Sequence, residues 1–137
     1  MKLTTRILTV GKPTLNGNIY DKVTIEEALA RLGGRPVYGQ LGMTGAPTMD
    51  TTLISHQASN LRIEDDALVA DIETLDTPSG RELVALIEDW QSVGHPIGNP
   101  GCFGFRPSGV GTTDKVGAFT FVTDYTLWSI NAVDDGA

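Results

Sequence analysis

The residues that could carry chemistry are few, because the sequence has one cysteine and two histidines. Cys102 is the only strong candidate nucleophile, but a thiol with a pKa near ~8.5 needs a base to attack a carbonyl at neutral pH. His56 is the better candidate base, since it lies on a predicted strand, whereas His95 precedes a proline in a predicted loop. Two interpretations remain open. Cys102 and His56 form a catalytic pair, or they are a small core residue and a hydrogen-bonded residue of the sheet, which is the more common situation.

The acidic residues between positions 65 and 76 do not have the spacing of a calcium-binding loop. Asp71 and Glu73 alternate with apolar residues on a predicted strand, which favours a solvated outer face. A single cysteine excludes an internal disulfide and a cysteine-based zinc site. Phosphate-binding, dinucleotide-binding and zinc-protease motifs are also missing from the sequence. The sequence therefore predicts neither a metal site nor a cofactor.

Length and charge narrow the possible functions further. The 137 residues suit a single domain, residues 1–137, with enough chain to bury a core. The net charge of -7, without a basic cluster, argues against nucleic-acid binding and against an anionic membrane surface. We find no apolar run long enough to span a bilayer and no secretory signal.

Local patterns predict the elements that must position these residues. β-branched and alternating segments predict strands at 3–10, 36–39, 52–61, 67–75, 103–106 and 119–130. Capping boxes at Thr24 and Ser79 predict two helices, the first ending at Gly33. Apolar residues on both faces of 119–130 indicate a central strand. The expected fold class is α+β, a mostly antiparallel sheet or small β-barrel with two helices.

Five short segments, in order along the chain, resemble motifs of the phage prohead proteases, which mature capsids and are related to herpesvirus assemblin. They are LNGNIY at 15–20, GQLGMT at 39–44, ISH at 54–56, LDTPSGREL at 75–83 and GCFGFRP at 101–107. The resemblance implies the fold of that family. It also places the family's catalytic histidine at Met43. The catalytic serine falls at Cys102, or at Gly104 or Phe105 if the alignment slides.

A thioether at Met43 can neither accept nor donate the proton that acyl transfer requires. The resemblance therefore implies a degenerate catalytic site and a non-catalytic virion protein. Such a decoration or cement protein would be made in the host cytoplasm and would then bind the major capsid protein at the capsid surface, as a homo-oligomer. The expected contact segments are the loops at 40–51 and 94–101. One alternative is an active maturation protease that uses Cys102 and His56, and another is an α+β binding module unrelated to phages.

Overall fold

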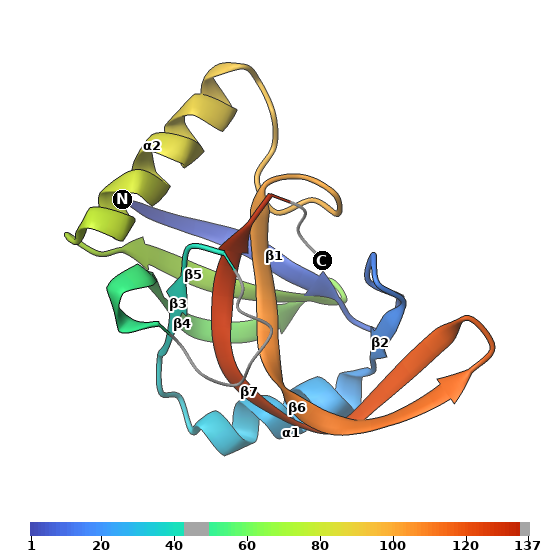
Figure 1. The fold of residues 1–137 in the computed structure, drawn as a ribbon. Helices are drawn as coiled ribbons and strands as arrows, with labels where there is room; N and C mark the ends of the chain where they lie inside the picture. Colours follow the sequence, from blue (N-terminus) through green and yellow to red (C-terminus); the bar gives the residue numbers. More distant parts are fainter. Residues whose placement is uncertain (43–49, 135–137) are drawn as a thin grey trace.

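The computed structural model describes residues 1–42 and 50–134 of the chain (Figure 1). The elements in chain order are β1 (Lys2–Thr9), β2 (Asn18–Tyr20), α1 (Lys22–Leu32), β3 (Val37–Gln40), a short 3-10 helix (Thr51–Leu53), β4 (Ile54–Glu64), β5 (Ala67–Thr74), α2 (Pro78–Ser92), β6 (Gly104–Val116) and β7 (Phe119–Val133). Within these residues, no helix is long and apolar enough to cross a membrane.

The strands form two sheets. The first has the order β1-β5-β4-β3 with every pair antiparallel. The second has the order β2-β7-β6, in which β6 and β7 are antiparallel and β2 is parallel to β7. The sheets meet where β3 runs alongside β7, through a parallel bridge between Leu41 and Ala132. The predicted α+β class is confirmed, and over the described residues the strands make two open sheets rather than a barrel.

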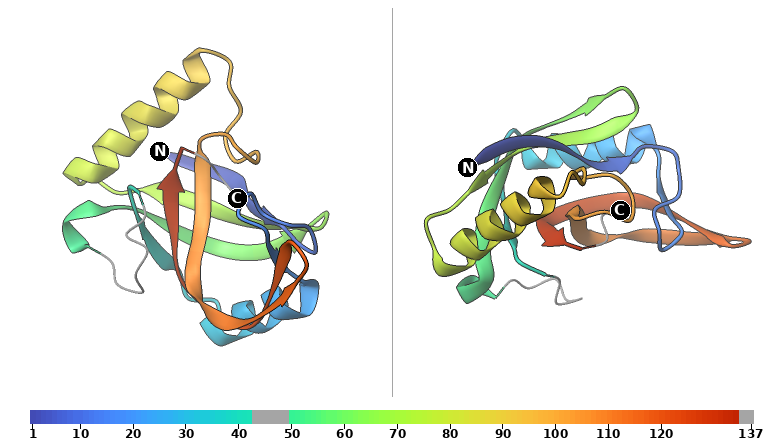
Figure 2. Two further views of the ribbon diagram at one scale, coloured as in Figure 1. Left: turned by 45° about the vertical axis from the view of Figure 1, so that its right-hand side comes forward. Right: turned by 90° about the horizontal axis from the view of Figure 1, so that it is seen from above.

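The core is built from the apolar faces of both sheets and both helices. On β5, Leu68, Ala70 and Ile72 are buried, as the alternating pattern predicted. Leu83 and Ile87 bury the inner face of α2, whereas Leu86 is exposed. Figure 2 shows α1 and α2 in different parts of the molecule, so that each covers a separate part of the core.

Both helices begin before their predicted caps. The cap of α1 is Asp21, whose carboxylate accepts a hydrogen bond from the backbone N–H of Thr24 at 2.8 Å. Thr24 is buried in the first turn, where its hydroxyl donates to the carbonyl of Val122 at 3.2 Å. The prediction of Thr24 as cap was wrong because the side chain has a tertiary partner on β7. The left-handed Gly33 ends α1 as predicted.

The same shift occurs at α2. Its cap is Thr77, whose hydroxyl accepts from the N–H of Gly80 at 2.9 Å, and Pro78 occupies the first helical position. Ser79, the predicted cap, is buried within the helix and donates to the carbonyl of Thr52 at 3.2 Å. A capping box predicted from local sequence was therefore again replaced by a tertiary contact.

We expect Asp21→Ala to lower the free energy of unfolding by about 1 kcal/mol, because the variant removes the oxygen that accepts the helix N–H. Asp21→Asn keeps an acceptor and serves as the control, with a loss of about 0.5 kcal/mol or less. Urea unfolding followed by far-UV circular dichroism measures both. An equal loss in the two variants would show that this cap does not stabilise α1.

The predicted strand at 103–106 is only the start of β6, which continues to Val116 and pairs with β7 along a long hairpin. The sequence of 107–116 is rich in Gly and Thr and gave no core-facing pattern, and residues 110–116 are all exposed where the hairpin extends past the core (Figures 1 and 2). β7 lies between β2 and β6, so its predicted central position is confirmed.

Candidate functional site

The structure does not bring the candidate nucleophile and base together. Cys102 is partly buried in the loop before β6, where its backbone N–H donates to the carbonyl of Asn99 at 3.0 Å. His56 lies on β4 and has no exposed surface. Among the described residues, no hydrogen bond joins the sulfur of Cys102 to either imidazole.

Both ring nitrogens of His56 already have partners. Nε2 lies 2.6 Å from the carbonyl oxygen of Ile130, which can only accept, so Nε2 carries the proton. Nδ1 lies 2.8 Å from the hydroxyl of Ser55, which therefore donates to it. Burial lowers the pKa of His56 to about 4 against the opposing effect of the Ile130 carbonyl. The imidazole is thus neutral at physiological pH and fully hydrogen-bonded.

Gly39 on β3 is what lets this ring reach β7. It is the register partner of His56, and a methyl group added at Gly39 would lie 1.9 Å from the Ile130 oxygen and 2.2 Å from Nε2 of His56. Any other residue would occupy the space through which the imidazole passes. Glycine at this position therefore permits a side-chain hydrogen bond between the two sheets.

Further buried polar groups continue this contact along β3 and β7. The Gln40 backbone N–H donates to the side-chain oxygen of Asn131 at 3.1 Å, and the Gln40 side chain accepts from the N–H of Asp50 at 2.9 Å. We call the group that joins the two sheets the seam. It consists of Gly39, Gln40, Ser55, His56, Ile130 and Asn131.

Of the two alternative positions for the family's catalytic serine, one contacts the seam. Gly104 is buried at the start of β6, and an added methyl group would lie 2.9 Å from the Cα of Gly98. Phe105 is 1% exposed, and its ring packs edge-on against His56 with 5.0 Å between the centroids. Of the three positions, Phe105 touches the histidine, and its phenyl ring carries no nucleophile.

The remaining candidates lie elsewhere. His95 lies in a loop, as predicted, where it is exposed and stacks on Trp90 with 4.6 Å between the ring centroids. Met43, the position assigned to the family's histidine, lies outside the described residues. The preceding Gly42, the last described residue of this segment, donates its N–H to the carbonyl of Ala132 at 2.8 Å.

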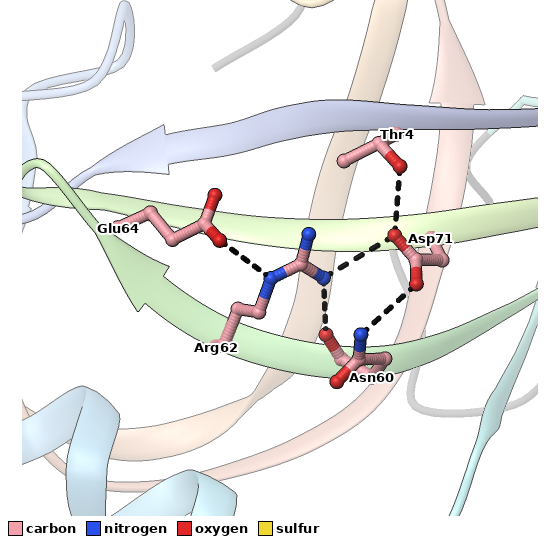
Figure 3. Close-up of polar contacts among 5 residues, drawn as sticks. All are labelled: Thr4, Asn60, Arg62, Glu64 and Asp71. Atoms are coloured by element: carbon pink, nitrogen blue, oxygen red, sulfur yellow. Dashed lines mark hydrogen bonds and ion pairs between the residues drawn. The ribbon is translucent and has the colours of Figure 1, made fainter.

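Asp71, one of the acidic residues between positions 65 and 76, belongs to a polar network on the first sheet (Figure 3). Asp71 accepts hydrogen bonds from Asn60, Thr4 and Arg62, and these bonds lower its pKa, with Asn60 contributing most. Arg62 also pairs with Glu64 at 2.9 Å. Over the part of the chain that the structure describes, no group of three acidic, histidine or cysteine side chains could hold a metal ion.

Two open sheets and two helices make up the fold, and comparison with solved structures shows that this fold is prohead-protease-like. The chain is similar to the capsid assembly protease gp21 of bacteriophage T4, with a TM-score of 0.78 over 96% of this chain and 80% of that one. The two sequences are 13% identical, so the likeness is one of fold. Neither a protein-family model nor a curated protein matches the chain.

Proposed function

We propose that this chain is a capsid-associated phage protein that binds the shell without cutting it. The fold shared with a phage capsid assembly protease supports the capsid association. The burial of His56 is the observation that carries the non-catalytic assignment. A general base must exchange a proton with groups of the substrate, and this imidazole has no exposed surface and is hydrogen-bonded to Ser55 and Ile130 inside the protein.

The Ser55 hydroxyl has the distance to His56 that a catalytic serine would have, but its surroundings differ from those of a nucleophile. Both residues have no exposed surface, so a peptide carbonyl cannot approach the hydroxyl in this conformation. The pKa of about 4 also leaves His56 a weak base. The pair is therefore suited to joining the sheets.

Cys102 is better placed to react than Ser55, because it is partly exposed. Its thiol lacks a histidine partner among the described residues. A thiol without a base as partner reacts slowly with peptide carbonyls at neutral pH. The pairing of Cys102 with His56 in a maturation protease remains the second candidate function, and the experiment below tests it.

The test mixes the purified protein with shells assembled from the major capsid protein encoded by the same genome. Wild type, Cys102→Ala and His56→Gln are compared by co-sedimentation and by mass spectrometry of the capsid protein. We expect wild type and Cys102→Ala to sediment equally with the shells and to leave the capsid protein intact. Cleavage by wild type that is lost in Cys102→Ala would establish the protease instead, and failure of wild type to sediment with the shells would overturn capsid binding.

A further inference from the structure

The outer part of the β6–β7 hairpin has an unpaired edge, and we propose that this edge pairs with the same edge of a second copy of the chain. We call residues 110–116 of β6 the edge segment. All seven of its residues are exposed, and β6 is the last strand of its sheet. The proposal concerns the isolated protein and does not depend on capsid binding.

The hairpin is held firmly by contacts on its other side. β2 pairs with β7 at Thr120–Val122, and Arg31 of α1 donates to the carbonyl of Tyr125 at 2.8 Å and pairs with Asp124. These contacts cover the β7 side and leave the β6 side unpaired, as Figure 1 shows for the hairpin that extends beyond the core. A long, fixed, unpaired edge is a template for another strand.

The composition of the edge segment favours pairing with another strand. Val110, Thr112, Thr113 and Val116 are β-branched, which suits an extended strand. The segment carries one acidic and one basic residue, so its net charge is zero in a chain whose net charge is -7. Two copies therefore approach with less repulsion here than over the rest of an acidic surface.

Symmetry and charge limit the register of the pair. Antiparallel copies of one strand are related by a twofold axis that passes through a residue facing its own copy. An axis at Asp114 or Lys115 opposes like charges, which destabilises a cross-strand pair. An axis at Thr113 instead places Val110 opposite Val116 of the second copy and Thr112 opposite Asp114. This register opposes no like charges and forms two apolar pairs.

The pairing also brings together an apolar face that the monomer leaves exposed. Val116 is 56% exposed and lies opposite Phe119, which is 44% exposed, and Phe121 is 39% exposed on the same face. In the proposed register, Val110 of the second copy extends this apolar row across the axis. The geometry gives a continuous six-stranded sheet in the order β2-β7-β6-β6-β7-β2.

Sedimentation equilibrium and site-specific crosslinking test the proposal on the protein alone. We expect a species of about 29 kDa, twice the chain mass of 14.6 kDa. Thr113→Lys opposes two cations at the axis and should raise the dimer dissociation constant at least about tenfold. The matched control is Thr123→Lys on the inner strand β7, which should leave the constant unchanged. Circular dichroism shows that both variants are folded.

The register itself is tested in a Cys102→Ala background. Thr113→Cys should form an intermolecular disulfide, because facing Cα atoms of antiparallel strands lie roughly 4.5–5.5 Å apart. Lys115→Cys should not, since four residues of offset separate the two copies by about 13 Å along the strands. The proposal would be overturned if the protein is a monomer at all concentrations, or if Thr113→Lys leaves the dimer dissociation constant unchanged. Equal crosslinking of the two cysteine variants would also overturn it.

Discussion

Gly39→Ala is expected to lower the free energy of unfolding by roughly 3 kcal/mol or more. The added carbon would lie 1.9 Å from the carbonyl oxygen of Ile130 and 2.2 Å from Nε2 of His56. One of these atoms belongs to the backbone and the other to a fully buried ring, so displacing either atom destabilises the fold. The strands β3 and β7 must separate, and the hydrogen bond between the sheets is lost.

Urea unfolding monitored by circular dichroism measures this loss. The control is Tyr38→Ala on the same strand, where the side chain is 48% exposed and the expected change is within about 1 kcal/mol. If Gly39→Ala unfolds within 1 kcal/mol of wild type, then β3 and β7 do not pack in the way described here. A large loss in both variants would show that β3 itself, rather than the seam, is sensitive.

The second large effect is a loss of stability on acidification caused by His56. Its pKa falls from 6.5 when unfolded to about 4 in the folded protein, because burial disfavours the charged ring. Between these values the unfolded chain binds a proton that the folded chain does not, so the free energy of unfolding falls as the pH falls. Over the full interval between the two pKa values, the free energy of unfolding falls by about 3 kcal/mol.

The experiment compares the free energy of unfolding at pH 7 and pH 4.5 for wild type, His56→Gln and His95→Gln. We expect the difference between the two pH values to be smaller in His56→Gln by about 2 kcal/mol or more. His95→Gln serves as the matched control, because it removes an exposed imidazole instead of the buried one. Comparing differences removes the contribution of carboxylates, which titrate in every variant. An unchanged difference in His56→Gln would contradict a buried neutral imidazole.

Much of the secondary structure was predictable because it depends on neighbours in the sequence. The alternation of Leu68, Ala70 and Ile72 predicted the buried face of β5, and Gly33 predicted the end of α1. The caps were less predictable. Thr24 and Ser79 match the local pattern of a helix start, yet each has a partner in a distant segment, and Asp21 and Thr77 cap instead.

The extent of β6 could not be predicted for a related reason. A strand is recognised in a sequence when one face is buried, but residues 110–116 are exposed throughout and gave no such pattern. Their extended conformation depends on pairing with β7, which supplies the backbone hydrogen bonds. The edge segment, and with it the proposed dimer, therefore became visible only in the fold.

The sequence by itself determined which side chains could do chemistry, the α+β class and most of the elements, because residue types and short-range periodicity carry that information. It also left two roles open for Cys102 and His56. The tertiary structure alone decided their surroundings. The imidazole crosses Gly39 to bond Ile130, 74 residues away in the chain, and the thiol lies in a loop outside this contact. Which strands adjoin depends on burying apolar surface across the whole chain, and no local pattern encodes it.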